Sequence, residues 1–531
     1  MCADVFDTIL NMVRVPELVA LDFRSMIACN NVARERLQAL YRKYGADVVS
    51  EVSRTLIAQS EDLLRARLRE LPDGSWTARQ YMDVAGTPFE IRLTMTKRDD
   101  ALSFDFTGTS PQADRAVNCT RWGAWGGLLA PLYPLLCHDI TWNEGLMKPV
   151  SVHAPDGTIV NATRPAPVSI ATVGAIQAVN NLSLICLSKM LASSEKYARE
   201  ATAVWQGSHL CIHLFGRNHR GQDVIGSTTE TFAGSGGGRW GADGIDLGGE
   251  IPNPISRMAN VETNEAMYPI RYLFRRRMRD SGGAGEFRGG TGGEYAMVPH
   301  DAPTGQVGFV ISGKGVDFPM SHGLAGGYPG GPGRYVICRQ ARSAEPTHDT
   351  PLRLGEIGGA HDVVSFGVYH VHNEDVFYVR WNGGGGVGDP LARDPDAVAR
   401  DVAENVVSSD AARALYGVLL ARDGSVDVEA TRRRRSDMRM ERAHTNVTAT
   451  LPAAAVTHCA CTHARPAASG DDVTVGVRDR VMSTIVPAYT TGPKAVLSEI
   501  VCPACGGLLD AQVTMLGADP LYDGRSEGEH P

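Results

Sequence analysis

The sequence predicts an α+β fold: a large, mostly antiparallel β core with flanking helices, plus a small C-terminal zinc-ribbon-like module. Three observations predict it. Of the 58 glycines in the 531 residues, 38 lie between residues 201 and 400, where they separate short β-branched and aromatic runs. The N-terminal side has a helical period, and four of the eleven cysteines lie near the C-terminus. Many short strands with glycine turns are typical of antiparallel sheets rather than of alternating βαβ units.

Four parts follow from this pattern. We expect a helical segment over 1–75, a β-rich core over 76–430 that ends in a helical pair, a basic and Ala-rich linker over 431–455, and a small Cys-rich module over 456–531. In the first part, apolar residues recur every three or four positions from about residue 24 to 71. Gly45 interrupts the series, which predicts two consecutive helices.

Local signals place further elements in the β-rich core. FEIRLTMTKRDDALSFDFTG (89–108) alternates apolar and polar residues on both sides of Lys97–Asp100, which predicts a hairpin. The apolar run 175–191 predicts a buried helix. Asp394 followed by Pro395 predicts the start of another helix, and Ser408 or Ser409 predicts the N-cap of the next.

Composition restricts the class of protein. The hydrophobic fraction of 43% and the net charge of −8 exclude wholesale disorder. With 52 Lys+Arg against 60 Asp+Glu, the chain has no general attraction to nucleic acid or to an anionic membrane. No apolar run reaches the roughly 18–20 residues that span a bilayer, and the N-terminus does not read as a secretory signal. We therefore expect a cytoplasmic protein without nucleic-acid or membrane partners.

The glycine clusters resemble nucleotide-binding loops only in part. Residues 308–315 match a phosphate-binding loop up to Lys314, but Gly315 stands where Ser or Thr should hold magnesium, and the interior FVIS is typical of a strand. If the reaction uses ATP, a partner should bind it. Gly282–Gly285 and Gly383–Gly386 lack the dinucleotide-binding spacing. They predict tight turns and close backbone approaches, with walls of a substrate site as the alternative.

Two further patterns carry possible chemistry in the core. His370 and His372 are two residues apart on a predicted strand and so share a face, where they could hold a metal or simply face solvent. Gly234-Ser235-Gly236 belongs to a glycine run and is not a G-x-S-x-G nucleophile elbow, so a serine hydrolase is disfavoured.

The strongest local signal lies near the C-terminus. Cys502-Pro-Ala-Cys505-Gly506 is a knuckle whose two thiolates can bind one tetrahedral zinc ion. Cys459 and Cys461 are the expected second pair of ligands, with His458 and His463 as alternatives. A redox pair or unrelated cysteines are the other interpretation. The preceding run Arg432–Arg435 is interpreted as a solvated linker, with recruitment of an acidic surface as the alternative.

Several long motifs, in this order, resemble the hydantoinase B/oxoprolinase family. They are DFTGTSPQ (105–112), RDSGGAGEFRGGTGG (279–293), GLAGGYPGGPGR (323–334) and NGGGGVGDPLARDPDAVARDVAENVVS (382–408). The helical segment before them and NVETNEAMYPI (260–270) also match, so the resemblance covers about residues 14 to 420.

The resemblance implies one half of a multi-subunit enzyme. A hydantoinase A-like partner would bind ATP and Mg and phosphorylate a carbonyl or enol oxygen of a small-molecule substrate. Two outcomes are known in the family: hydrolysis of ring amides, and carboxylation of ketones with bicarbonate. Asp105, Thr107 and Thr109, near the first motif, are the candidate catalytic residues, with hydroxyl and carboxylate groups that can orient a proton transfer.

Two departures from the family pattern shape the expectation. Family chains normally begin with a longer stretch that holds a His/Asp/His metal constellation, whereas residue 14 already matches the segment after it. Either a small subunit supplies that segment, so that any catalytic divalent metal lies on another chain, or this protein does not use that metal. Second, the family's polar HTHMTNT-like run is replaced by IPNPISRMAN (251–260).

The C-terminal part favours one branch of the family. Residues 456–515 resemble the small Cys-rich, zinc-binding subunit that accompanies acetone carboxylase. The sequence therefore predicts a subunit of an ATP-dependent carboxylase that acts on a ketone-type substrate, with structural zinc in this chain. The alternatives are a subunit of an ATP-dependent cyclic-amide hydrolase and a non-catalytic assembly subunit.

Overall fold

The structure of the chain is a computed structural model. It describes residues 2–13, 15–254, 256–341, 353–445, 447–452, 461, 472–485, 492–518 and 520–521. The chain divides into two compact units: unit 1 is Met1–Arg65 with Asp139–Pro149, and unit 2 is Ala66–His138 with Val150–Pro531. The predicted α+β class with mostly antiparallel sheets is confirmed.

Unit 1 consists of helices. It contains α1 (Ala3–Asn11), α2 (Pro16–Tyr44) and most of α3 (Ala46–Arg69). Gly45 separates α2 from α3 with a φ of 84°, so the predicted break between two helices is confirmed. The segment 139–149 is fixed to α3 by a hydrogen bond of 2.8 Å from the Asn143 side-chain amide to the Ser60 hydroxyl.

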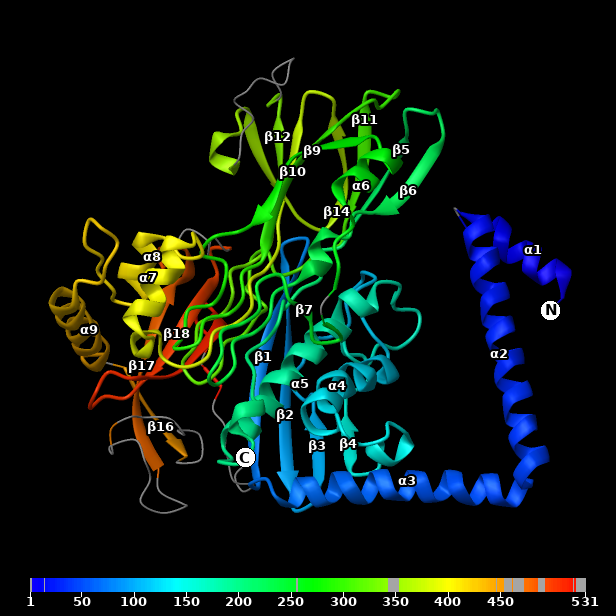
Figure 1. Cartoon of the computed structure of the whole chain (residues 1–531), viewed down its shortest axis with the longest axis horizontal. Helices are drawn as coiled ribbons and strands as arrows, with labels where there is room; N and C mark the ends of the chain where they lie inside the picture. The colour runs from blue at the N-terminus through cyan, green and yellow to red at the C-terminus, as the bar shows by residue number, and fades with distance from the viewer. Residues whose placement is uncertain are drawn as a thin grey trace. The chain divides into compact units, whose positions relative to one another are not determined.

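The first sheet of unit 2 carries two helices. Its strands are β1 (Gly74–Val84), β2 (Thr87–Arg98), β3 (Ala101–Asp105) and β4 (Val150–His153), and only the β3–β4 pair is parallel. The predicted hairpin is confirmed as β2–β3, with Asp99 in a left-handed turn conformation. Helices α4 (Arg121–Leu136) and α5 (Ala175–Ala192) pack against each other, and α5 packs on β1 and β2 (Figure 1).

Helix α5 is the buried helix that the sequence predicts. Nearly all of its residues are buried, from Ala175 to Ala192. In the described ranges, Ala171–Ala192 is the one helical segment long and apolar enough to cross a membrane by length and composition, and most of it is buried inside the molecule.

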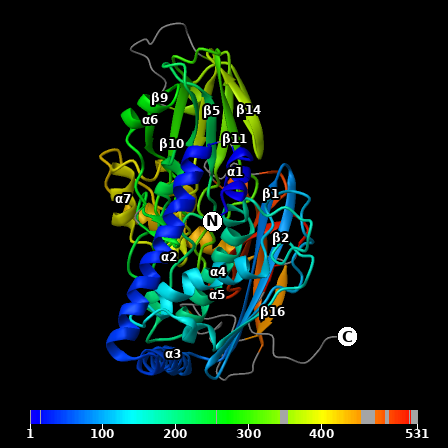
Figure 2. The same cartoon turned by 90° about the vertical axis from the view of Figure 1, so that its right-hand side faces the viewer.

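Two antiparallel sheets in unit 2 share one hydrophobic core. One has the order β13-β12-β15-β10-β9 and the other β14-β11-β5-β6 (Figure 2). Side chains from both sheets meet in it; the Phe309 and Phe377 ring centroids, for example, are 4.6 Å apart. The strands are β5 (Ile212–Arg217), β6 (Asp223–Ser227), β9 (Ile270–Arg277), β10 (Gly293–Pro299), β11 (Gln306–Ile311), β12 (Arg334–Arg339), β13 (Ala360–Val364), β14 (Gly367–His372) and β15 (Val376–Arg380).

The remaining short elements lie between the longer helices and strands. They are β7 (Gly249–Glu250), β8 (Asn253–Pro254), α6 (Val261–Met267) and 3-10 turns at Glu144–Met147, Ala171–Val173, Ala198–Glu200, Glu230–Ala233, Leu354–Glu356, Pro390–Ala392 and Met482–Thr484.

The glycine-rich motifs form a layer of stacked backbone. The amide of Gly283 donates to the Gly384 carbonyl at 2.8 Å, and the amide of Gly384 donates to the Gly290 carbonyl at 2.9 Å. A Cβ at Gly384 would collide with the carbonyl oxygen of Gly236. These glycines are buried, so they are the close backbone approaches that the sequence predicts and do not line an open site.

The C-terminal elements join the same unit. Helices α7 (Pro395–Ala403) and α8 (Ser409–Leu415) begin after the N-caps Asp394 and Ser408, as predicted. After α9 (Val428–Ala443), a four-stranded sheet has the order β16-β17-β18-β19. Its strands are β16 (Thr448–Pro452), β17 (Asp472–Val481), β18 (Ala495–Val501) and β19 (Leu508–Met515).

The predicted linker over 431–455 and the predicted separate module over 456–531 stay predictions, since parts of both lie outside the described residues. Within the described residues, α9 occupies the first part of the predicted linker, and β17, β18 and β19 belong to unit 2. Residues 428–443 are the helix α9, which the Asp427 side chain caps by accepting from the Ala430 amide at 2.9 Å. Leu497 and Val513 of the C-terminal sheet share one hydrophobic cluster with Tyr81 of β1 and Val398 of α7. The run Arg432–Arg435 lies in α9, and only a narrow face of this helix is buried. Its buried residues are Thr431 and Arg442.

Candidate functional site

Three cysteines meet at the turn between β18 and β19. The Sγ atoms of Cys461, Cys502 and Cys505 all lie within 4.8 Å of one another, and those of Cys461 and Cys502 are 3.5 Å apart. A tetrahedral zinc ion with Zn–S bonds of ~2.3 Å places its sulfur atoms ~3.8 Å apart. The three thiols therefore fit one face of such a tetrahedron. Cys459, His458 and His463 lie outside the described residues.

The backbone at Cys502 has the geometry of a metal knuckle. The Gly506 amide donates to the Cys502 carbonyl at 2.8 Å, and the Cys502 amide donates to the Gly507 carbonyl at 2.9 Å. Gly506 has a φ of 65°, and a Cβ there would collide with the carbonyl oxygen of Arg439. Only glycine fits this turn, which holds Cys502 and Cys505 on the same side.

The thiol cluster has a dry, apolar shell on one side. Cys502 is buried among side chains of β17, β18 and β19, and Cys461 and Cys505 pack against the same group: Val473, Val475, Ile500 and Leu509. Excluding water on this side favours thiolate–metal bonds over hydrated ions. The cluster of three cysteines can thus hold a metal ion.

The predicted catalytic residues Asp105, Thr107 and Thr109 form a turn after β3. Asp105 Oδ1 accepts hydrogen bonds from the Thr107 amide at 2.9 Å and from its hydroxyl at 2.7 Å. The Thr109 hydroxyl bonds to the backbone of Arg92 on β2 at 3.2 Å. These contacts close the turn, and no other titratable side chain bonds to the Asp105 carboxylate among the described residues. A catalytic role for the three residues stays a prediction.

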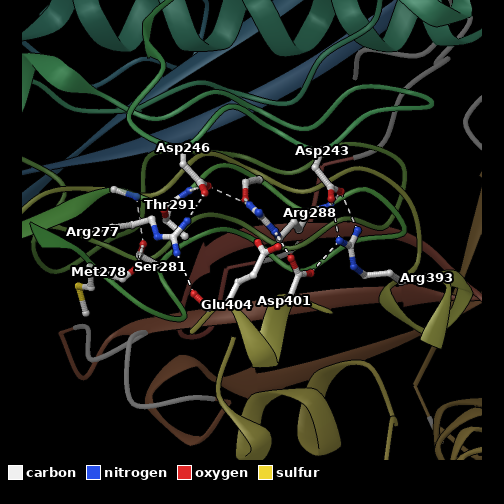
Figure 3. Close-up of polar contacts among 12 residues, drawn as sticks. Asp243, Asp246, Arg277, Met278, Ser281, Arg288, Thr291, Arg393, Asp401 and Glu404 are labelled. Atoms are coloured by element: carbon white, nitrogen blue, oxygen red, sulfur yellow. Dashed lines mark hydrogen bonds and ion pairs between the residues drawn. The ribbon is translucent and has the colours of Figure 1, made fainter. Parts of the chain in front are cut away.

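A buried charge network joins two of the family-like motifs (Figure 3). Arg288 contacts Asp401 at 3.1 Å and Asp246 at 3.0 Å. Arg393 pairs with Asp243 at 2.6 and 2.7 Å and with the other oxygen of Asp401 at 2.7 Å. Asp401 thus bridges two arginines that are far apart in the sequence, and it ties the glycine layer to α7.

Electrostatics support a structural role for this network. Burial raises the pKa of Asp246, but Arg288, the Thr291 amide and Arg277 together outweigh burial and the pKa is lowered. Burial opposes the charge of Arg288, yet the three aspartates around it raise its pKa. Because these arginines and aspartates pair with one another, we interpret them as structural residues that hold the glycine layer against α7. Sequence reasoning missed it because pairing between distant motifs leaves no spacing signal.

A second buried cluster, which the sequence did not predict, contains an imidazole held by a carboxylate. His209 Nε2 lies 2.8 Å from Glu250 Oε2, and the Gln206 side-chain amide donates to Glu250 Oε1 at 2.9 Å. Burial raises the pKa of Glu250, while His209 acts in the opposite direction. His209 Nδ1 is buried and has no hydrogen-bond partner among the residues that the structure describes.

This His209–Glu250 pair has the form of a proton-transfer group. A carboxylate that fixes one ring nitrogen leaves the other nitrogen to accept or donate a proton. Glu250 directly precedes the segment 251–260, where the sequence departs from the family pattern. His209 comes from the loop before β5, so only the fold brings the two residues together.

The segment that resembles a phosphate-binding loop is part of a sheet. Gly308 and Phe309 lie in β11 and pair with β14 on one side and β5 on the other. Lys314 is 1% exposed and donates to the Ser312 carbonyl at 2.5 Å, and burial lowers its pKa to about 8. The backbone amides of a central strand are used in the ladder, so this segment does not cradle phosphates.

His370 and His372 share one exposed face of β14, as their spacing predicts. His372 Nδ1 lies 3.4 Å from Asp375, and the His370 ring contacts Phe215 edge-on. Within the described part of the chain, the thiol cluster is the one group of three close metal-ligating side chains, and these histidines are not in it. The solvent-facing interpretation of the pair therefore fits its surroundings.

Comparison with known proteins identifies the family to which this architecture belongs. The sequence model of "Hydantoinase B/oxoprolinase" matches residues 1–390. Caprolactamase subunit beta of Pseudomonas jessenii is 27% identical, over 82% of this chain and 72% of the relative. Acetophenone carboxylase delta subunit of Aromatoleum aromaticum is 24% identical, over 80% of this chain and 64% of the relative.

The fold is also that of a solved structure. A chain of acetone carboxylase in its nucleotide-free structure superposes with a TM-score of 0.74 at 22% identity, covering 84% of this chain and 63% of that one. The ordered motifs, the β-rich core and the match over residues 1–390 agree. The chain belongs to the hydantoinase B/oxoprolinase family.

Proposed function

We propose that this chain is one subunit of an ATP-dependent, multi-subunit carboxylase, which converts a ketone-type substrate with bicarbonate through phosphorylated intermediates. A hydantoinase A-like partner binds ATP and Mg in this proposal. Family membership supports the general scheme, because relatives of this chain are subunits of ATP-dependent enzymes.

One observation supports assigning ATP binding to the partner and conversion of the activated substrate to this chain. The segment 308–315 is the part of this sequence that most resembles a nucleotide-binding loop. Its residues 308–311 belong to the central strand β11, and Lys314, which follows the strand, is buried. A P-loop needs free backbone amides and an accessible ammonium group to hold the phosphates. Assigning ATP to a partner follows from this, and the role left to this chain is conversion of the activated substrate.

The choice of carboxylation rests on the relatives and on the C-terminal cysteines. An acetophenone carboxylase subunit and acetone carboxylase are among the similar proteins. The thiol cluster adds support, because residues 456–515 resemble the zinc-binding subunit of acetone carboxylase. The second candidate is hydrolysis of a cyclic amide, which the similarity to a caprolactamase subunit favours.

We assign the proton transfer in either reaction to His209. Glu250 holds Nε2 and leaves Nδ1 to take or give a proton at the substrate. Asp105, Thr107 and Thr109 remain the alternative group, with the Asp105 carboxylate as the acid–base atom. Both assignments concern residues of this chain, whereas ATP chemistry belongs to the partner.

Isotope labelling separates the two reactions. The chain is co-expressed with its partner subunits, and ATP turnover is measured with a panel of ketones plus ¹⁴C-bicarbonate and with hydantoins and lactams. The proposal expects ATP-dependent transfer of label to an acid-stable product from a ketone. Ring opening of an amide without label incorporation would establish the second candidate instead. ATP turnover with neither class would favour an assembly role.

We further propose that Cys461, Cys502 and Cys505 hold a structural zinc ion, with Cys459, His458 or His463 as the fourth ligand. The support is the fit of the three sulfur atoms to one tetrahedral face and the glycine-dependent knuckle. Zinc bound here would connect β18, β19 and the chain around Cys461.

Metal analysis tests the zinc assignment. We expect one zinc per wild-type chain and less than a tenth of that in Cys505→Ser, because three ligands hold zinc far more weakly than four. Cys29→Ser removes an exposed thiol of unit 1 and serves as the matched control. Equal zinc content in Cys505→Ser and wild type would contradict the assignment, as would the absence of zinc from wild type purified without chelators.

A further inference from the structure

A groove runs along the outer face of α9. It has a volume of about 640 Å³ and extends from the loop before α9 to the metal knuckle. We call it the α9 groove and define it by six of its lining residues: Val426, Arg432, Arg435, Arg439, Met440 and Cys505. With a rise of ~1.5 Å per residue, the helix gives the groove a length of roughly 20 Å.

The α9 groove is positively charged in an otherwise acidic chain. Arg432, Arg435 and Arg439 follow one another at three and four residues, so they lie on one face of the helix. Among the described residues that line the groove, Asp396 is the single acidic one. The whole chain has a net charge of −8, so the groove has the opposite sign to the chain as a whole, although Arg432 also pairs with Glu429 outside the groove lining.

Two of these guanidinium groups are held in place without a carboxylate partner. Arg435 donates to the backbone carbonyls of Tyr416 at 2.9 Å and Arg393 at 2.7 Å. Arg439 donates to the Leu391 carbonyl at 3.4 Å. Neither forms an ion pair with a described carboxylate. Burial lowers the pKa of Arg435 and the nearby charge of Arg439 lowers it further, while Asp389 and Asp394 act in the opposite direction without forming an ion pair with it.

Apolar side chains accompany the charges. Val428 is 65% exposed and Met440 is 51% exposed, and both line the groove. At the far end, Ala504 and Cys505 of the knuckle complete the lining, and Gly506 packs directly on the backbone of Arg439. The groove therefore offers an apolar floor with fixed guanidinium groups along it, which suits an elongated ligand with both characters.

We propose that the α9 groove docks an acidic, amphipathic segment of a partner subunit. Carboxylates of the segment pair with Arg435 and Arg439, and its apolar side chains cover Val428 and Met440. Guanidinium groups fixed by carbonyls are well suited to such pairing, because little ordering is needed on binding. The proposal rests on the proposed function only in requiring a partner subunit.

Charge and shape favour this occupant over other anions. A nucleic acid needs an extended basic surface, and the acidic net charge of this chain opposes it. Free phosphate or a phosphorylated metabolite would use the arginines but leave the apolar floor of the groove uncovered. A peptide segment uses both features.

Charge reversal in the intact complex tests the proposal. Arg439→Glu keeps a long side chain at an exposed position but opposes an acidic segment, whereas Arg433→Glu makes the same change at an exposed α9 residue that does not line the groove. Assembly of each full-length variant with purified partner is followed by sedimentation velocity. We expect Arg439→Glu to raise the Kd about tenfold or more, less so at high salt, and Arg433→Glu to change it less than twofold.

A cross-linking experiment identifies the occupant independently of affinity. A photoreactive amino acid at Met440 in the purified complex should cross-link to a partner segment rich in Asp and Glu. Equal affinities of both variants, or cross-links only within this chain, would overturn the proposal. So would loss of inorganic phosphate or RNA binding by Arg439→Glu with partner affinity unchanged. Assembly is measured without turnover, so an inactive complex that still assembles contradicts the proposed reaction and leaves the docking result intact.

Discussion

At the residue scale, His209 is the side chain whose surroundings point most directly to proton transfer. Glu250 pairs with one ring nitrogen, and the other has no hydrogen-bond partner in the described part of the chain. In the reconstituted enzyme, we expect His209→Gln to lower kcat by about 10²-fold or more with a smaller change in KM. His213→Gln removes an exposed histidine of β5 and is the matched control. Activity of His209→Gln within twofold of wild type would exclude the assignment.

Asp401 is the residue on which the buried charge network depends. It contacts both Arg288 and Arg393 and is 6% exposed. Asp401→Asn leaves two buried guanidinium groups short of a countercharge, so we expect the free energy of unfolding in urea to fall by about 3 kcal/mol. Asp223→Asn, at an exposed pair with Arg217, should change it within experimental error. Similar effects of the two variants would contradict this structural role of the network.

At the element scale, the glycine layer sets how closely the loops of unit 2 approach. Gly384 has no positive φ, so its requirement for glycine is purely one of space: a Cβ would collide with the Gly236 carbonyl. We expect Gly384→Ala to destabilise the chain by about 3 kcal/mol or to prevent soluble expression. Gly358→Ala, at a position with nothing nearby, is the control. Equal thermal midpoints of the two variants would contradict the close-packed layer.

Sequence patterns predicted the elements whose signals are local. The break at Gly45, the hairpin at Lys97–Asp100 and the caps Asp394 and Ser408 were all readable, because turn and cap chemistry depends on neighbouring residues. Helix α4 was missed because Pro131 and Pro134 lie inside it. The inclusion of the C-terminal sheet in unit 2 depends on packing against distant strands, which no local pattern reports.

Among the candidate sites, too, those with a local sequence signal were predicted and those formed by distant residues were not. Cys502 and Cys505 could be predicted because the knuckle motif spans only four consecutive residues. The fold brings Cys461 close to them. The pairs His209–Glu250 and Arg288–Asp401 join residues 41 and 113 positions apart, and a charged residue in isolation predicts no particular partner. Asp105 was chosen for its motif, and the structure places it in a turn that it closes by its own hydrogen bonds.

At the scale of the whole molecule, the proposed function is that of a subunit that completes a reaction begun on a partner subunit. Three features fit a chain that relies on a partner for ATP. They are the 308–315 segment, which lies partly in β11, the buried network around Asp401, and the cationic α9 groove. Family membership gives the same expectation, since similar proteins are subunits of ATP-dependent enzymes.

Reconstitution with ATP tests this central claim most directly. ATP hydrolysis is measured for the purified chain alone, for its hydantoinase A-like partner alone, and for the two together with substrate. We predict no nucleotide binding or hydrolysis by this chain alone, and substrate-dependent ATP turnover coupled to product formation only when both are present. Stoichiometric ATP binding with turnover by this chain alone, lost on changing Lys314 to Ala, would contradict the account.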